Sequence, residues 1–346
     1  MGRYDCVVLY NAANISEIEG SQEKMYPSTI IREEVGAIEE SLRSAGYSPN
    51  VLSVDHFSKD LVQTLVKLAP KFVFNLCEEI NGKVELEMCV AGLLELMGIS
   101  YTGSGPFALG LALNKFHVKQ ILKSAGIPVA KGYLHYPGKK PSPRAIRFPV
   151  IVKPAREDAS LGINSNSVCQ DNAHLERQVA YIHNVYQQEA LIEEYLDGRE
   201  FNVSIMGDRE PQVLAISEID FSQMPDEEPK IVSFRAKWDD ESPMYGSTVP
   251  VCPAQISKRL ERRIKDIALR SYKCVGCRDY ARVDMRTDPK GNLYVLEVNP
   301  NPDISPEAGF ARAARAAGYS YGEMILHICQ AAIERGAKVA ANVYAF

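Results

Sequence analysis

The sequence predicts an α/β protein in which an open parallel sheet is followed by lobes built on antiparallel strands. Short apolar strands alternate with amphipathic helices up to residue 101, and this alternation is typical of parallel sheets with right-handed crossovers. The turn cluster at 101–106 then marks a lobe boundary. Beyond it, short strands follow one another with few helices between them, which favours antiparallel pairing.

The first lobe is expected to alternate strand and helix. Its strands are predicted at Cys6–Tyr10, Val51–Val54, Phe72–Leu76 and Ile99–Tyr101. The helix after the first strand has one apolar face, because its apolar residues recur at intervals of four, three and four: Ile31, Val35, Ile38 and Leu42. Two further helices are predicted, one carrying Leu61, Leu65 and Leu68 and one running from Leu86 to Met97. In such a sheet, ligands usually bind at the carboxyl ends of the strands.

A single helix, Phe107–Ser124, is predicted after the turn cluster, with Gly126 and Pro128 as stop signals. The strands predicted next are Val150–Lys153, Ser165–Cys169, Leu191–Tyr195, Phe201–Met206 and Val213–Ile219. An amphipathic helix around Leu260–Ala268 precedes two late strands, Ala281–Met285 and Leu293–Val298, and two Ala-rich helices close the chain.

Composition excludes several classes of protein. The 346 residues exceed one average domain, and 46% apolar and 24% charged residues are ordinary for a soluble globular protein. A net charge of −5 argues against a nucleic-acid partner, which requires a basic surface. Neither a signal-peptide pattern nor an apolar stretch near the ~20 residues of a membrane span occurs. We therefore expect a cytoplasmic protein without membrane or nucleic-acid partners.

The eight cysteines fit a reducing compartment, since most lie in apolar runs. Cys274 and Cys277 form the one close pair, and a zinc site would need a second pair or two suitably spaced histidines, which do not follow. A buried structural pair is favoured over a redox pair.

Two late strands each carry polar residues two positions apart. Arg282 and Asp284 lie in one strand, and Glu297 and Asn299 lie in the other. Residues two apart point to the same face of a sheet, and the turn-rich segment 287–292 predicts a hairpin that joins the two polar faces. Two carboxylates and an amide oxygen suit Mg²⁺ with nucleotide phosphates, and Arg282 would neutralise a phosphoryl group in transfer. A solvated hairpin is the alternative, but the apolar residues between these positions indicate that the opposite face is buried.

Lysines at two places are candidates for a nucleotide site. Lys115 lies inside the predicted helix 107–124, and Lys153 ends an apolar strand before a proline, where it is poorly placed for solvent. The polar segment 156–162 that follows suits a loop whose backbone N–H groups cover phosphates. No GxxxxGK[ST] pattern occurs, so a P-loop is excluded.

The strand 191–196 runs into Asp197-Gly-Arg-Glu200. Its edge could meet adenine through backbone groups while Glu200 binds ribose hydroxyls. An acidic strand end without a ligand fits these residues equally well.

Taken in order, these segments resemble the D-alanine–D-alanine ligase branch of the ATP-grasp superfamily, most clearly from Phe74 onward. The matching stretches are 93–105, 114–115, 150–157, 191–201, 236–237, 281–284 and 296–302. The resemblance implies an ATP-grasp fold with an N-terminal pre-ATP-grasp domain at 1–103, a central lid lobe at 104–188 and a C-terminal lobe with the metal site at 189–346. It implies that ATP is bound by Lys115, Lys153, Glu193, Glu194, Leu196, Glu200 and Lys237, and the metal by Asp284, Glu297 and Asn299.

The resemblance also implies the chemistry. A carboxylate attacks the γ-phosphate of ATP to give an acyl-phosphate and ADP, and an amine then attacks and releases phosphate. Catalytic roles fall to Arg282, Lys237 and Ser160, with ATP and Mg²⁺ as cofactors, two magnesium ions being expected and Mn²⁺ an alternative. The central lobe is expected to close as a lid that excludes water. Ligases of this type are commonly dimers, so a homodimer through the N-terminal lobe is expected.

The departures from the family fall in the amino-acid pocket. No match to the family's N-terminal glutamate is found where Met25–Thr29 lies. The family's serine falls at Ala159, next to Ser160, and its tyrosine falls at Trp238. Asn81 replaces a histidine of the N-terminal lobe.

On the acceptor side, Asp303 replaces the family's glycine, and its carboxylate disfavours another carboxylate in a partly dry pocket. We therefore predict a ligase that kept the ATP machinery and changed its substrates, to other amino acids or small peptides. A true D-alanine–D-alanine ligase, with Ser160 and Trp238 as stand-ins, is the first alternative. A nucleotide-binding protein without ligase activity is the second, although it would have little need for Arg282 beside the metal set.

Overall fold

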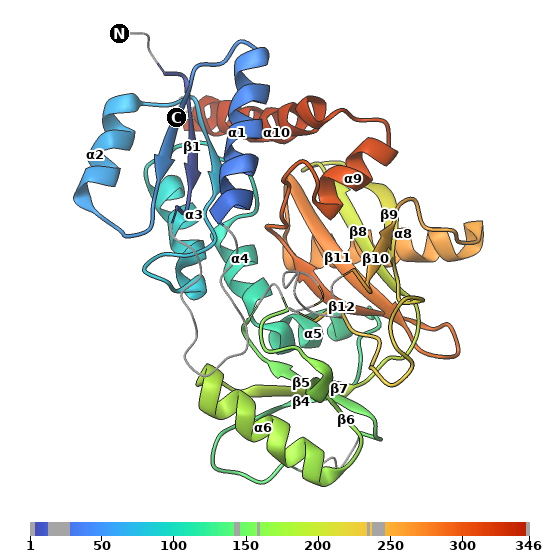
Figure 1. The fold of residues 1–346 in the computed structure, drawn as a ribbon. Helices are drawn as coiled ribbons and strands as arrows, with labels where there is room; N and C mark the ends of the chain where they lie inside the picture. The colour runs from blue at the N-terminus through green and yellow to red at the C-terminus, as the bar shows by residue number, and fades with distance from the viewer. Residues whose placement is uncertain are drawn as a thin grey trace.

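The computed structural model describes residues 4–12, 28–141, 146–157, 160–233, 236 and 246–343, without the side chains of 28–30 and 338–343. Within these ranges the strands form three sheets, which Figure 1 shows as separate lobes, with α4 and α5 between the first lobe and the other two. None of the described helices combines the length and apolar character needed to cross a membrane.

The N-terminal sheet is parallel, as predicted, with strand order β2–β1–β3. Its elements are β1 (Cys6–Tyr10), α1 (Ser28–Ser44), β2 (Pro49–Ser53), α2 (Lys59–Leu68), β3 (Phe72–Leu76), η1 (Val84–Leu86) and α3 (Glu87–Leu96). Successive β1 residues alternate between two cores, with Cys6 and Val8 facing α1 and Val7 and Leu9 facing α2 and α3. The strand predicted at 99–101 is wrong, because only an isolated bridge joins Tyr101 to β3.

The helix predicted over 107–124 is in fact two helices, α4 (Pro106–Leu113) and α5 (Lys115–Ser124). Asn114 between them has non-helical dihedrals, φ −90 and ψ 91, and its side chain accepts a hydrogen bond from the His117 N–H. An asparagine that caps a new helix in this way stops the preceding one. Lys115 is therefore the first residue of α5 and not a residue of a helix interior.

The lid sheet is antiparallel, with strand order β4–β7–β5–β6. Its elements are β4 (Gly132–His135), β5 (Val150–Pro154), η2 (Ser165–Ser167), β6 (Val168–Cys169), α6 (Asn172–Tyr186) and β7 (Ala190–Glu194). The strand predicted at 165–169 is mostly the 3₁₀ turn η2, stabilised by a capping box with Asn164. Neither β4 nor α6 was predicted, and α6 covers one face of the sheet in Figure 1. Since β7 belongs to this sheet, we propose that the lid lobe, expected to end at 188, continues through Glu194.

The C-terminal sheet is antiparallel, with strand order β10–β9–β8–β11–β12. Its strands are β8 (Glu200–Met206), β9 (Gln212–Asp220), β10 (Val249–Val251), β11 (Tyr280–Thr287) and β12 (Leu293–Asn299). The helix α8 (Lys258–Val275) packs on one face, and α9 (Gly309–Ala316) covers part of the other, whose remaining part lines a site. After α9, α10 (Tyr321–Val343) returns to pack on α1 and β3 in Figure 1 and joins the last lobe to the first.

The Cys274–Cys277 pair is not bonded, and all eight cysteines are free. Burial raises the pKa of the Cys277 thiol to about 12, so it is a poor thiolate nucleophile. This favours the structural interpretation of the pair.

Candidate active site

A cavity of about 850 Å³ lies between the lid sheet and the C-terminal sheet. Its walls include all of the predicted site residues that the structure describes: Lys115, Lys153, Ser160, Glu193, Glu194, Leu196, Glu200, Arg282, Asp284, Glu297 and Asn299. The predicted catalytic residue Lys237 lies outside the described residues, as do Ala159 and Trp238. The structure thus brings together, in one cavity, residues from four separate stretches of the chain.

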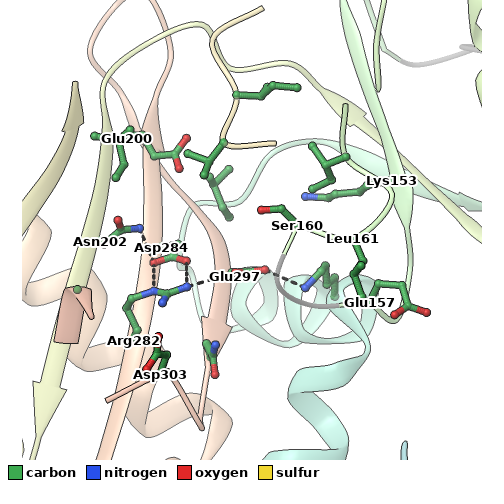
Figure 2. Close-up of a pocket in the computed structure, with 18 of the residues that line it drawn as sticks. Lys153, Glu157, Ser160, Leu161, Glu200, Asn202, Arg282, Asp284, Glu297 and Asp303 are labelled. Carbon is green, nitrogen blue, oxygen red and sulfur yellow. Dashed lines mark hydrogen bonds and ion pairs between the residues drawn. The ribbon is translucent and has the colours of Figure 1, made fainter. Parts of the chain in front are cut away.

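The paired strands β11 and β12 form one wall of the cavity, and the hairpin predicted from the sequence is confirmed. In their antiparallel register Arg282 lies opposite Asn299, and Asp284 lies opposite Glu297. Directly opposed residues share a face of the sheet, so these four side chains point into the cavity together. Figure 2 shows this wall, with Lys153, Ser160 and Glu157 on the other side.

Cations hold the two carboxylates of this wall. The Arg282 guanidinium donates from Nε and Nη2 to the two oxygens of Asp284, each at 2.8 Å, and Asn202 Nδ2 on β8 donates to Asp284 Oδ1 at 2.8 Å. The buried Lys115 Nζ lies 2.8 Å from Glu297 Oε2. Burial alone would raise the pKa of Glu297, but Lys115 and then Arg282 outweigh it and hold that pKa well below its usual range. Glu297 is therefore ionised at neutral pH.

These residues fit a divalent metal. Their donors are two carboxylates and an amide, the hard oxygens that Mg²⁺ prefers, and Asn299 Oδ1 already accepts from the Asn301 N–H at 2.9 Å, which orients the amide. In the described part of the chain, no group of three or more His, Cys, Asp or Glu side chains could hold a metal ion. The site thus depends on the amide of Asn299 and on oxygens that a ligand would supply.

The lid wall carries a buried cluster of one carboxylate and two ammonium groups. Lys153 Nζ on β5 lies 2.8 Å from Glu193 Oε2 on β7, and Lys119 Nζ on α5 contacts Glu193 Oε1. Burial raises the pKa of Glu193, but Lys119 and Lys153 outweigh it and the net shift is downward. Lys119 was not among the predicted site residues. Its spacing of four from Lys115, within the predicted helix 107–124, was the available signal.

Glu200, expected at the ribose, is fixed by an arginine that the sequence did not single out. Arg286 Nη1 on β11 lies 3.2 Å from Glu200 Oε2, and both side chains are buried. The guanidinium lies over the rings of Tyr195 and Phe221, 5.3 Å from each centroid. Arg286 continues the alternation of Arg282 and Asp284 along β11, which is the signal that could have found it.

Arg156 and Glu157, at the start of the segment 156–162, are held to the turn that follows α6. The Arg156 N–H donates to Gln188 Oε1 at 2.7 Å, Gln188 Nε2 donates to Glu157 Oε1 at 2.6 Å, and Arg156 Nη1 pairs with Glu189 at 2.5 Å. The glycine of the segment, Gly162, has φ +74, and a Cβ there would lie 2.4 Å from the Pro154 side chain.

Two of the residues that depart from the family's pattern, Asn81 and Asp303, lie in the described part of the chain and differ in their position relative to the cavity. Asn81 is not among the residues that line the cavity, and its Oδ1 lies 2.8 Å from His56 Nδ1. Asp303 does line the cavity. Burial first, and then the carboxylates of Asp303 and Glu78, raise the pKa of the neighbouring Glu34 well above its usual range.

Comparisons with known proteins show the family to which the chain belongs. Residues 121–330 match a family model described as D-ala D-ala ligase C-terminus. A D-alanine–D-alanine ligase of Desulforudis audaxviator is 33% identical over 302 residues, which is 85% of this chain and 91% of that protein. An uncharacterized protein of Sinorhizobium fredii, y4sG, is 34% identical over 287 residues, which is 80% of this chain and 81% of its own length. The crystal structure of the Bacillus anthracis D-alanine–D-alanine ligase complexed with ATP has a TM-score of 0.73 at 22% identity, covering 96% of this chain and 99% of that one.

The fold and the site define the protein as an ATP-grasp ligase, a class of enzyme that forms C–N bonds. The chain belongs to the D-alanine–D-alanine ligase family.

Proposed function

We propose that this chain joins a carboxylate to an amine at the expense of Mg²⁺-ATP, through an acyl-phosphate. One observation carries the proposal: Asp284, Glu297, Asn299 and Arg282 converge on one side of a cavity whose lid wall carries Lys153. A site that only bound a nucleotide would not need an arginine aimed at the metal-type carboxylates. The nucleotide-binding protein without ligase activity is therefore the weaker alternative.

The residues take roles that follow from their chemistry. Lys115 and Lys153 would hold the phosphates, and Glu200 would bind the ribose from β8 while Leu196 lies beside the adenine. When bound, Mg²⁺ would be held by Asp284, Glu297 and Asn299 and would neutralise charge on the transferred phosphoryl group. Arg282 would stabilise the same charge, and Ser160, which lines the cavity, would hold the donor carboxylate. Lys237 keeps its expected role at the γ-phosphate as a prediction.

The substrates are proposed to be amino acids or small peptides. Two amino acids would enter a D-alanine–D-alanine ligase, and the acceptor brings an α-carboxylate with it. Asp303 lines this end of the cavity, and its carboxylate disfavours a second carboxylate there. We therefore favour an acceptor whose amine carries no carboxylate nearby, such as the N-terminal amine of a small peptide. A true D-alanine–D-alanine ligase stays the alternative, because several relatives carry that name.

The test is ATP-dependent phosphate release over a panel of amino acids and dipeptides, with mass spectrometry of the products. A ligation product other than D-alanyl-D-alanine is the expected result. Formation of D-alanyl-D-alanine as the main product would favour the alternative, and phosphate release with no ligated product from any pair would contradict the ligase assignment. The cytoplasmic location and the homodimer through the N-terminal lobe stay predictions.

A further inference from the structure

The helix α5 carries two buried lysines that reach in different directions. Lys115 and Lys119 are four residues apart and so lie on the same side of the helix. Lys115 contacts Glu297 on β12 of the C-terminal sheet, whereas Lys119 contacts Glu193 on β7 of the lid sheet. The Lys115 N–H also donates to the carbonyl of Ala155, just beyond β5. This helix therefore ties together the two sheets on either side of the cavity.

Glu193 is held in place from three sides. Lys119 contacts Oε1, Lys153 Nζ lies 2.8 Å from Oε2, and the opposing residue on β4 is Gly132. A Cβ on Gly132 would lie 2.8 Å from Glu193 Cγ, so the glycine is what gives the carboxylate its room. The side chains of Lys119 and Glu193 are 3% and 2% exposed, so their contact is almost completely shielded from water.

The charges of the cluster do not balance. Two ammonium groups share the carboxylate of Glu193, so the cluster carries one more positive charge than negative, and the Glu297 carboxylate offsets part of that charge at Lys153. If Lys119 were absent, Glu193 would neutralise Lys153 alone. With Lys119 present, one oxygen of the Glu193 carboxylate is already paired with Lys119. The surplus positive charge then lies at Lys153, which lines the cavity.

We propose that Lys119 is a positioning residue for the nucleotide phosphates: by sharing Glu193, it fixes the carboxylate and keeps Lys153 available as a cation toward the cavity. The inference rests on the proposed function, in that the cavity binds ATP. Lys119 itself is not among the residues that line the cavity, so its effect on a ligand passes through Glu193 and Lys153.

The pH dependence of binding follows from the groups around Lys119. Burial lowers the pKa of Lys119 to about 8, opposed by Glu193 and assisted by Lys153 and Lys115. From β12, Glu297 faces Lys115, and α8 packs on α5 through apolar residues that include Ile264 and Ala268. Below its pKa, Lys119 is protonated and the surplus charge is present. As the pH rises through this pKa, Lys119 loses its proton, and the Glu193 carboxylate then neutralises Lys153 alone. The affinity of the cavity for an anionic nucleotide therefore falls.

Nucleotide binding by calorimetry, with ADP and Mg²⁺ at several pH values, tests the proposal. Lys119→Met keeps the length of the side chain and removes its charge, and the exposed Lys123 on the same helix supplies the control, Lys123→Met. At pH 7 the Kd of Lys119→Met is expected to rise about tenfold, while that of Lys123→Met matches the wild type. The wild-type Kd is expected to rise between about pH 7 and pH 9, and that rise is expected to be absent in Lys119→Met.

Lys119→Arg keeps the test decisive if the methionine variant does not fold. Arginine does not titrate in this range, so this variant is expected to bind ADP at pH 7 and to keep its affinity at pH 9. A wild-type Kd and pH profile in Lys119→Met, or a wild-type pH profile in Lys119→Arg, would overturn the inference. No binding of ADP to the wild type would overturn the proposed function itself, which separates the two failures.

Discussion

Replacing Glu297 with glutamine tests the proposed metal ligands on β11 and β12 with little change in the shape of the side chain. The variant removes one of the two carboxylates that face each other across β11 and β12, and with it the partner of Lys115. Loss of an outer-shell partner already costs roughly 10–100-fold in metal affinity, so loss of a direct ligand is expected to cost at least about 100-fold. We expect turnover to fall about 1,000-fold or more.

The same substitution has a second consequence in the absence of metal. The Lys115 ammonium is 5% exposed and lies 2.8 Å from a Glu297 carboxylate that is 29% exposed, so the pair is only partly screened. A hydrogen bond to a charged group contributes about 1.5–3 kcal/mol, and the free energy of unfolding of the metal-free protein should fall by that amount. Metal-free nucleotide binding should not weaken, because Lys115 and Arg282 lose an anionic neighbour.

Three measurements check these expectations: steady-state turnover against Mg²⁺ concentration, urea denaturation, and calorimetry with ADP and a chelator. Glu261→Gln is the matched control, since Glu261 forms a surface pair with Lys265 at 2.6 Å on α8. Glu297→Gln with wild-type turnover and an unchanged Mg²⁺ dependence would refute the metal assignment.

Three further substitutions test other parts of the site. Arg282→Met removes both hydrogen bonds to the neighbouring aspartate, and kcat should fall by about 10²–10³ with little change in the Kd for ADP; a kcat within twofold of the wild type in steady-state kinetics would contradict this. Gly132→Ala places a Cβ 2.8 Å from Glu193 Cγ, so the free energy of unfolding should fall by about 1–3 kcal/mol in urea, and an unchanged midpoint would contradict it. Arg286→Met removes the cation that pairs with the buried Glu200, so the free energy of unfolding measured with denaturant should fall by about 3–5 kcal/mol. Adding Glu200→Gln to this variant should restore part of the lost stability, and no recovery would exclude the ion pair as the cause.

The parts of the fold that the sequence predicted are those where a local pattern decides the outcome. Residues two apart in β11 and β12 share a face by strand geometry alone, and the turn-rich segment between them left a hairpin as the simplest connection. The parallel N-terminal sheet followed from strand–helix alternation in the same way. These features depend on contacts close in sequence or on a fixed period.

The errors in predicting helices arose at polar residues that interrupt an apolar pattern. Asn114 reads as one polar position in an apolar run, yet its side chain caps α5 and ends α4. In α6 the buried Gln178 interrupts the apolar face, so the helix was missed even though Asp171 caps it. In both helices the N-cap residue was the local signal that could have marked the start of the helix.

Partners of the site residues could not be predicted, because they are distant in the chain. Asn202 and Asp284 are 82 residues apart, Arg286 and Glu200 are 86, and Lys119 and Glu193 are 74. Each pair depends on the register of strands or on a helix packed across two sheets, which composition and spacing do not determine.

Transfer of oxygen from the donor carboxylate tests the central claim most directly. With a donor found in the substrate panel and labelled with ¹⁸O in its carboxylate, an acyl-phosphate passes one labelled oxygen to the released phosphate when the amine attacks. Mass spectrometry of the phosphate should therefore show one ¹⁸O for each ligated product. Unlabelled phosphate, released at the same rate as product, would contradict the acyl-phosphate and with it the function proposed for this site.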